Sequence, residues 1–268
     1  MDNICQKFLP ISPWEKNVTS RLPGIQPLEH MDSLYMVDDA FNAQMSYRDF
    51  LIKEKRSEIF YLSEKSLHSA QELLESVIAI LKNNSRYKIY PDRIQRPDKK
   101  IIYLKEDNPI IIAGRLIQED LLILHWDNNF QEHILEGGIL CFPALWTLNE
   151  KINKPLSRIH KPVEQYNEKI TKSVQRMFNN LKVDKPIWRA NWYLYKDPEL
   201  FSPLSEKFSH TTEKKYFEGD FWLRVERQTL KRLPETNAIV FGIHTYVVNK
   251  KQLTLKQITS LKNYSLNK

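Results

Sequence analysis

One histidine stands in a context that suits a single-ligand metal role. His160 lies in the string Ile-His-Lys-Pro-Val, where an irregular segment meets a predicted amphipathic helix. Pro162 restricts the backbone there, and Val163 begins the apolar stripe of the helix. A single imidazole held rigidly above an apolar cavity is what an axial haem ligand requires, because haem iron needs only one strong protein donor. The alternative interpretation is a histidine that caps the helix or is satisfied inside the core.

The other histidines lack the spacing of a multi-histidine metal site, since no HExxH, HxE or paired-histidine pattern occurs. Most of them lie in polar or unpatterned surroundings and are expected to be surface or structural residues: His30, His68, His125, His133 and His210.

Three charges fall within a stretch that has the pattern of a strand, at Arg224, Glu226 and Arg227. An unpaired buried charge costs about 3 to 5 kcal/mol, so at least one of them must be paired or must meet an ionic ligand. One interpretation is an Arg-Glu pair within the chain. The other is a site where arginine holds a carboxylate and Glu226 meets a cation. Four tryptophans offer flat surface for a cofactor pocket, although most aromatic residues are expected to be core: Trp146, Trp188, Trp192 and Trp222.

The composition of the 268 residues excludes several kinds of site. There are only 6 glycines, and none falls in a GxGxxG or GxxxxGK[ST] loop for nucleotide phosphates. Cys5 and Cys141 are too few for an iron-sulfur cluster or a thiolate zinc site. The net charge of +7 comes from Lys and Arg scattered among acids, which favours a solvated surface over nucleic-acid binding.

The N-terminus has no basic region followed by an apolar one, and no stretch approaches 18 uninterrupted apolar residues. We therefore expect a cytoplasmic protein without a membrane segment.

The elements that must position these residues begin with a proline-containing stretch. Residues 1–35 predict an extended N-terminal arm, and residues 36–268 a single domain. Residues 38–56 predict a short helix, and 67–81 predict an amphipathic helix with Ser63 as a candidate cap. Short apolar runs predict strands at residues 101–104, 110–113, 121–124 and 138–142. The alternative for residues 116–124 is a segment that begins as a helix.

The second half of the chain shows clearer periodic patterns of apolar and polar residues. An apolar stripe after His160 predicts a helix that ends before Pro186: Val163, Tyr166, Ile170, Val174, Met177, Phe178 and Leu181. Residues 187–195 predict a strand with Arg189 and Asn191 on one side and Trp188 and Trp192 on the other.

A hairpin is the strongest local signal. Its arms are residues 221–233 and 238–248 around the turn Pro-Glu-Thr-Asn, and its first arm alternates so that Arg224 and Glu226 share a face while Arg227 lies on the other. Residues 196–220 predict a long loop that closes over substrate, and residues around 255–261 a C-terminal helix.

Several strings resemble one known family, the haem-dependent oxidative N-demethylase alpha-subunit family. They run from about Pro27 to the C-terminus: Cys141-Phe142-Pro143 with Trp146, Pro155-Leu156 with Ile159-His160, Pro162-Val163 with Tyr166, Arg189 with Asn191-Trp192, Gln118-Glu119-Asp120-Leu121, and above all Arg-Val-Glu-Arg-Gln-Thr-Leu-Lys-Arg-Leu-Pro ending at Pro234. The resemblance implies an α+β fold with a PAS-like antiparallel sheet core, surrounding helices and one haem b.

The same resemblance implies an oxidoreductase of the monooxygenase type. O2 is activated at iron, the N-methyl group of a small secondary amine such as dimethylamine is hydroxylated, and amine and formaldehyde are released. It implies His160 as the axial ligand, Arg189 and Arg224 as partners of the haem propionates, and Glu226 as the group that attracts the ammonium or relays protons. Asn191 and Trp192 belong to the same cofactor-binding set.

The chain departs from the family at one position. Where the family has Ile-Arg-Thr-Tyr, this sequence has histidine at position 244, which replaces a permanent charge with a titratable ring. His244 is therefore the second candidate for the haem ligand.

Without a nucleotide loop or cluster cysteines, the chain is expected to receive electrons from a partner. The resemblance implies a reductase subunit with flavin and an iron-sulfur cluster that oxidises NADPH, and a folate-binding protein that collects formaldehyde. The alternative function is a non-catalytic PAS-like sensor or binding protein for haem or another ligand.

Overall fold

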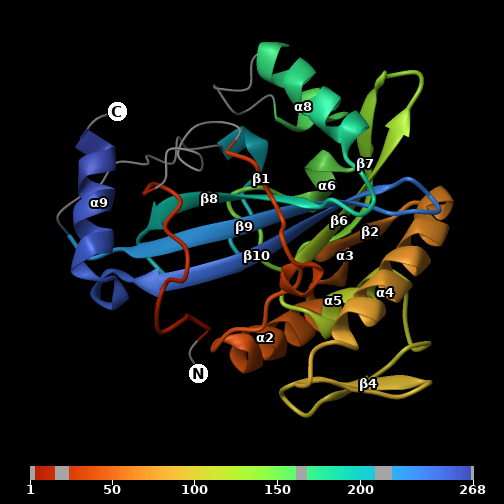
Figure 1. Ribbon diagram of the computed structural model, residues 1–268, viewed down its shortest axis with the longest axis horizontal. Coiled ribbons are helices and arrows are strands. Elements are labelled where there is room, and N and C mark those ends of the chain that lie inside the picture. Colours follow the sequence, from red (N-terminus) through yellow and green to blue (C-terminus); the bar gives the residue numbers. More distant parts are fainter. Residues whose placement is uncertain (1–3, 16–23, 161–167, 209–218, 267–268) are drawn as a thin grey trace.

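A twisted antiparallel sheet forms the centre of the computed structural model (Figure 1), which describes residues 4–15, 24–160, 168–208 and 219–266. Its seven strands lie in the order β1-β8-β9-β10-β6-β7-β2. Every pair of neighbouring strands is antiparallel, and β6 and β7 are offset by a bulge near Ile123. The strand bounds are β1 Gln26–Pro27, β2 Phe60–Leu62, β6 Asp120–Asp127, β7 Glu132–Ile139, β8 Ile187–Tyr195, β9 Trp222–Arg232 and β10 Ile239–Asn249.

The predicted hairpin is confirmed as β9 and β10, whose register runs without interruption from Trp222 opposite Asn249 to Arg232 opposite Ile239. Its turn is closed by a backbone bond from Leu233 to Ala238 of 2.9 Å. Glu72 accepts hydrogen bonds from the backbone N–H groups of Glu235 and Thr236, which fixes the turn against a helix far away in sequence.

Strand alternation gives the sheet two chemically different faces. Residues directly opposite each other on β8, β9 and β10 share a face. One face, here called the α8 face, contains Arg189, Asn191, Tyr193, Arg224, Glu226, Gln228, Ile243 and Thr245. The other, here called the α4 face, contains Trp188, Ala190, Trp192, Val225, Arg227, His244 and Tyr246. The predicted separation of Arg189 and Asn191 from Trp188 and Trp192 is confirmed.

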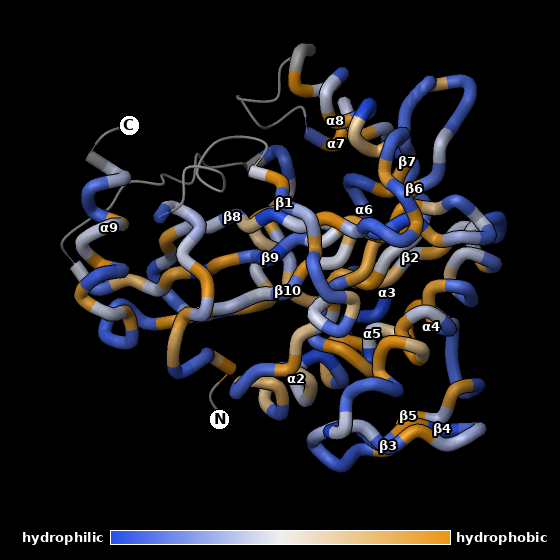
Figure 2. Tube along the Cα trace, in the orientation of Figure 1, coloured by the Kyte–Doolittle hydropathy of each residue, from blue (hydrophilic) through white to orange (hydrophobic). Residues whose placement is uncertain are grey.

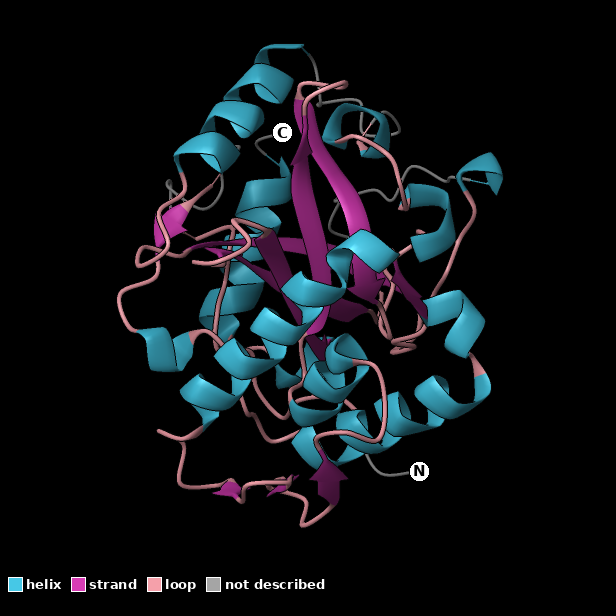
Figure 3. Cartoon of the chain, turned by 90° about the vertical axis from the view of Figure 1, so that its right-hand side faces the viewer, coloured by secondary structure: helices cyan, strands magenta, loops and turns pink. Residues whose placement is uncertain are grey.

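Helices cover both faces, as the turned view in Figure 3 shows. The α4 face packs at one end against α2, α4 and α5, and at the other end against the N-terminal arm and α9. The α8 face packs against α6, α7 and α8. The helix bounds are α2 Phe41–Glu54, α3 Arg56–Ile59, α4 Leu67–Leu81, α5 Pro109–Leu116, α6 Leu148–Lys151, α7 Leu156–Ile159, α8 Glu168–Asn180 and α9 Leu255–Leu266, with 3₁₀ turns at Met31–Ser33, Glu64–Ser66, Glu206–Phe208 and Lys250–Gln252.

The predictions of helices around residues 41–54, 67–81, 168–180 and 255–266 are confirmed. Val163 and Tyr166 of the predicted stripe lie outside the described residues, as does much of the loop predicted to act as a lid, so closure of that loop stays a prediction. In the arm, Trp14 packs edge-on against Trp192 at 5.5 Å between ring centroids, and Gln26 and Pro27 pair with β8.

The prediction of a strand at residues 110–113 is wrong, because this run lies inside α5. Asn108 caps the helix by accepting a hydrogen bond from the N–H of Ile110, and Pro109 occupies its first turn. The whole run is buried, and Figure 2 shows the apolar colouring of α5. A helix buried on every side has no amphipathic period, so its pattern resembles that of an internal strand.

The predicted strand at 138–142 is confirmed only as far as Ile139, where β7 ends. The next backbone groups bond to a side chain instead, because Asp120 accepts from the N–H groups of Cys141 and Phe142 at 2.7 and 3.0 Å. Cys141 and Cys5 are both buried, and neither is in a disulfide. Burial raises the pKa of the Cys5 thiol to about 11 and that of the Cys141 thiol to about 12.

A second, three-stranded antiparallel sheet lies at the edge of the molecule, away from the α8 face (Figure 1). It consists of β3 Lys88–Ile89, β4 Arg93–Gln95 and β5 Ile101–Tyr103. The observed combination of helices and antiparallel sheets confirms the predicted α+β class.

Candidate functional site

Four of the predicted site residues meet on the α8 face of the sheet. Arg189 and Asn191 extend from β8, while Arg224 and Glu226 extend from β9. Asn191 lies directly opposite Glu226 in the register of these strands. Alternation along two adjacent strands is therefore sufficient to bring two arginines, an amide and a carboxylate to one place.

Both terminal nitrogens of the Arg224 guanidinium are bonded to groups of the same chain. Its side chain is buried, Nη1 donates to the carbonyl oxygen of Leu200 at 3.1 Å, and Nη2 donates to the carbonyl oxygen of Phe142. The same Nη2 lies 3.3 Å from Glu226 Oε1. The pairing of Arg224 with Glu226 agrees with the first interpretation of this charged stretch, and Arg224 anchors two loop segments to the sheet.

The side chain of Arg189, unlike that of Arg224, has no bonded partner among the described residues. No side-chain hydrogen bond or ion pair joins Arg189 to the residues that the structure describes, and its Nε is buried without a partner among them. Burial lowers the pKa of its guanidinium, since Glu226 and Tyr193 compensate for the lost hydration only in part. A buried cation of this kind is stabilised by an anionic ligand.

His160 follows the single-turn helix α7 directly. Its Nδ1 lies 2.9 Å from the carbonyl oxygen of Leu156, one turn earlier, so Nδ1 carries the proton that it donates. Burial lowers the pKa of the imidazole, and the positive charges of Lys151 and Arg189 act in the same direction. The ring is therefore neutral at pH 7, with its lone pair on Nε2, which is the tautomer of a metal-binding histidine.

Arg189 also acts electrostatically on His160 and lowers the pKa of its imidazole. Sequence reasoning singled out both residues but gave no reason to expect them together, because residues 160 and 189 are 29 positions apart in the chain. The structure adds Lys151 to this region, a residue that no sequence pattern marked.

Glu226 lies on the same face of the sheet as Arg189 and acts electrostatically on it. It is 6% exposed, bonds to Arg224, and accepts a hydrogen bond from the side-chain amide of Gln228 at 3.2 Å. Its neighbour across β10, Thr245, has a buried hydroxyl without a partner among the described residues. The carboxylate is thus fixed in direction and flanked by polar groups.

Two predicted cofactor residues lie elsewhere, on the α4 face. Trp192 packs between Trp14 and Tyr264. His244 is fully buried, with Nδ1 3.1 Å from Glu119 and Nε2 3.0 Å from Asp38. The structure therefore does not bring either residue to the His160 region.

The charge state of His244 follows from its two carboxylate neighbours. Burial alone would lower its pKa, but Glu119 and Asp38 outweigh that effect and raise the pKa to about 9. As an imidazolium with both N–H groups engaged, His244 has no lone pair to offer to iron. It connects the segment at Asp38 to the sheet, which is a structural role.

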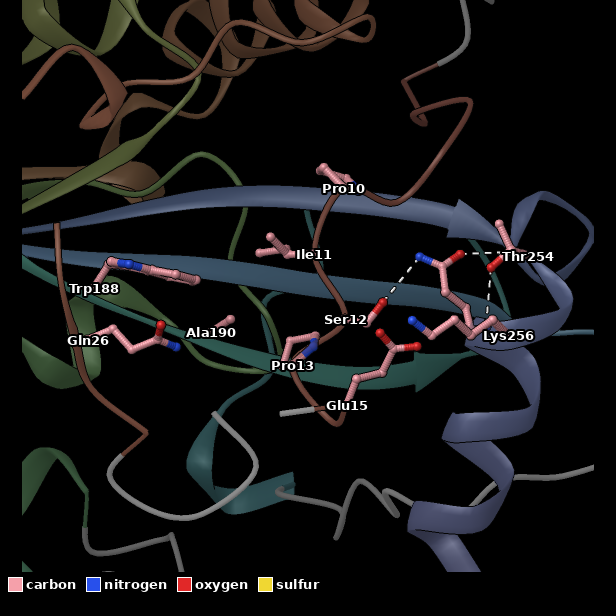
Figure 4. A pocket seen from close by; sticks show the side chains of 11 residues that line it. Pro10, Ile11, Ser12, Pro13, Glu15, Gln26, Trp188, Ala190, Thr254 and Lys256 are labelled. Carbon is pink, nitrogen blue, oxygen red and sulfur yellow. Dashed lines mark hydrogen bonds between the residues drawn. The ribbon is translucent and has the colours of Figure 1, made fainter. Parts of the chain in front are cut away.

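Two cavities border described residues away from His160. One of about 340 Å³ lies between the arm, β8 and α9, with Trp188, Gln26 and Glu15 among its walls (Figure 4). Another of about 250 Å³ lies beside α6, next to Leu148 and Phe201. The first opens on the α4 side of β8, opposite to Arg189, and no histidine lines either cavity.

The residues near His160 fit the donor set that haem requires. His160 supplies a neutral imidazole, Arg189 supplies a guanidinium whose Nε is buried without a partner among the described residues, and apolar side chains of α6, α7 and α8 pack on the same face of the sheet. A haem carries an iron that takes one axial nitrogen and propionates that take arginine. The fit rests on these groups and not on Arg224, whose terminal nitrogens are already bonded.

None of the helices within the described ranges is long and apolar enough to cross a membrane.

Comparison with known protein families gives one match. Residues 24–262 match the family described as "Haem-dependent oxidative N-demethylase, alpha subunit-like", which confirms the resemblance drawn from the sequence strings. The match spans the arm strand β1, the whole central sheet and most of α9. The chain therefore belongs to the haem-dependent oxidative N-demethylase alpha-subunit-like family.

Proposed function

We propose that the chain is the haem b-binding catalytic subunit of an oxidative N-demethylase that acts on a small secondary amine such as dimethylamine. The observation that best supports this proposal is the His160 imidazole, which donates from Nδ1 to the Leu156 carbonyl oxygen and is influenced electrostatically by Arg189, whose Nε is buried without a partner among the described residues. Family membership supports the oxidative N-demethylase class and a dependence on haem.

In this proposal His160 Nε2 would hold the haem iron, and the direction of the imidazole is set by the hydrogen bond that Nδ1 donates to the Leu156 carbonyl oxygen. Arg189 would bind a propionate, whose negative charge would add to the partial compensation that Glu226 gives. The α6, α7 and α8 side chains exclude water from the nonpolar part of the group.

Glu226 is the proposed acceptor for the amine substrate. A secondary amine is protonated near pH 7, and a buried carboxylate on a rigid strand attracts and orients such a cation. Arg224 keeps the carboxylate in place and so acts as a positioning residue. When the amine must lose its proton before oxidation, the Glu226 carboxylate on this face receives it in our proposal.

Bound haem would supply O2 activation and oxidation of the N-methyl carbon. The carbinolamine product separates into the shortened amine and formaldehyde. The overall reaction consumes O2, two electrons and two protons and releases one water. We assign the electrons to a separate reductase subunit that carries flavin and an iron-sulfur cluster and oxidises NADPH, and the formaldehyde to a folate-binding acceptor protein.

The PAS-like description of the core belongs to the same proposal. It is supported by the continuous antiparallel set of strands β7-β6-β10-β9-β8. It is also supported by helices α6, α7 and α8, which lie between β7 and β8 in the chain and pack on the α8 face.

The test combines spectroscopy with product analysis. Purified protein loaded with haem should show a Soret band typical of histidine ligation, and His160→Ala should lose that signature, whereas the exposed control His30→Ala should retain it. Formaldehyde should form from dimethylamine with NADPH and a competent reductase. An unchanged spectrum in His160→Ala would place the ligand elsewhere. Haem binding without formaldehyde would favour a sensor.

A further inference from the structure

A buried lysine connects three segments of chain beside the proposed haem ligand. Lys151, the last residue of α6, is 6% exposed. Its Nζ donates to the carbonyl oxygen of Ile159 at 2.8 Å and forms an ion pair with Glu206 Oε1 at 2.5 Å. Ile159 is the residue immediately before His160.

The carboxylate of Glu206 extends this connection. Its second oxygen lies 3.0 Å from Arg158 Nη2, so Glu206 joins the end of α6 to α7. The turn that carries Glu206 is itself fixed, because Glu150 accepts the backbone N–H of Glu206 at 3.1 Å and the hydroxyl of Ser205 at 2.6 Å. We refer to Lys151, Arg158 and Glu206 as the α7 clamp.

Helix α7 is too short to be stable without contacts to other parts of the chain. It consists of Leu156–Ile159 only, and a single helical turn is unstable in isolation because nucleation costs more than one hydrogen bond returns. The carbonyl groups at a helix C-terminus lack partners within the helix and carry a partial negative charge. The ammonium of Lys151 satisfies one of these carbonyls and compensates that charge.

We propose that Lys151 is the positioning residue of His160. By fixing the carbonyl of Ile159, it sets the orientation of α7 and hence the direction in which the His160 imidazole points. This inference rests on the proposed ligation of haem iron by His160. Lys151 touches neither the iron nor the substrate in this scheme and acts only through the backbone of α7.

The test is the rate at which the ferric protein transfers haem to an excess of apomyoglobin. Lys151→Met keeps the aliphatic stem and removes the charge, and we expect haem loss to be at least tenfold faster, with a weaker histidine-ligation spectrum. Lys154→Met is the matched control, an exposed lysine three residues away, and should stay within twofold of wild type. Lys151→Arg, which retains a cation, should recover part of the loss.

The decisive measurement repeats Lys151→Met in a His160→Gly background. If Lys151 acts through His160, it should change the transfer rate there by less than twofold, because the coupled pair is non-additive. An equal acceleration in both backgrounds, or no acceleration in the His160-containing protein, would overturn the inference.

Failure of the proposed haem ligation by His160 can be distinguished from failure of the inference about Lys151. If His160→Gly alone leaves the spectrum and transfer rate unchanged, His160 is not the ligand, and both the assignment and the clamp's role are wrong. If Lys151→Met does not fold, Glu206→Gln replaces it, since this partly exposed carboxylate can be neutralised without placing a new group in the core. We expect about threefold faster haem loss from that variant, and a wild-type rate would contradict the inference.

Discussion

Charged side chains on the two faces of the central sheet differ in whether they have bonded partners within the described chain. On the α4 face, His244 lies between Glu119 and Asp38, and Arg227 donates to the carbonyl oxygens of Ser33 and Leu34. On the α8 face, Arg189 finds no bonded partner in the described chain. The difference indicates that these charges on the α4 face hold the chain together, whereas Arg189 on the α8 face is available to a ligand, unlike Arg224 on the same face, which is paired with Glu226.

The largest expected effect concerns His244. Replacing it by Gln removes the cation from two buried carboxylates and should lower the free energy of unfolding by about 3 to 5 kcal/mol at pH 6. The folded-state pKa of about 9 lies above the ordinary value of 6.5, so the stabilisation is complete below pH 6.5 and is lost as the pH rises through 9.

Urea unfolding of wild type and His244→Gln between pH 6 and 9.5 measures this difference. The gap between the two proteins should narrow steadily above pH 6.5. A gap that is independent of pH would show that His244 is not the titrating group.

The next prediction compares two arginines on neighbouring strands. Arg227→Met should cost about 3 kcal/mol, because two carbonyl oxygens of the arm lose a charged donor. Arg189→Met in the haem-free protein should change the free energy of unfolding by less than about 1 kcal/mol or should stabilise, because its charge is desolvated without compensation.

Both variants are compared in urea with and without haem. Added haem should stabilise the wild type more than Arg189→Met, and it should stabilise Arg227→Met as much as the wild type. Equal costs for the two substitutions in the haem-free protein would contradict the contrast between the faces.

The smallest expected effect is that of Glu226→Gln. Glutamine keeps an oxygen for Arg224, which also retains its bonds to Leu200 and Phe142, so the cost should be about 1 kcal/mol. Thermal or urea unfolding at pH 7 provides the measurement. A loss of 3 kcal/mol or more would make Glu226 a structural counter-ion and would weaken its proposed role toward the amine.

Local patterns predicted the parts of the fold that depend on neighbouring residues. The turn Pro-Glu-Thr-Asn between two β-rich arms predicted the hairpin, and alternation placed Arg224 and Glu226 together because side-chain direction has a period of two. The same rule separated Arg189 from Trp192 on β8. These inferences need no knowledge of tertiary contacts.

Long-range partners were not predictable in the same way. Asp38 is 206 positions from His244, and no pattern joins them before the chain folds. Lys151 and Glu206 likewise meet across 55 positions. The helix at residues 110–113 was missed because burial on every side removed the period that identifies a surface helix. The roles assigned to His160, Arg189 and Glu226 stay predictions until haem binding is measured.

The two buried thiols have a practical consequence. Cys5 belongs to the N-terminal arm and Cys141 lies beneath the Asp120 carboxylate, and the high pKa of each keeps it protonated at neutral pH. Alkylating reagents should therefore reach either sulfur only when its own surroundings open. The alkylation rate of Cys5 therefore reports detachment of the arm, and that of Cys141 reports exposure of the core. Mass spectrometry of the two cysteine-containing peptides measures the two rates separately.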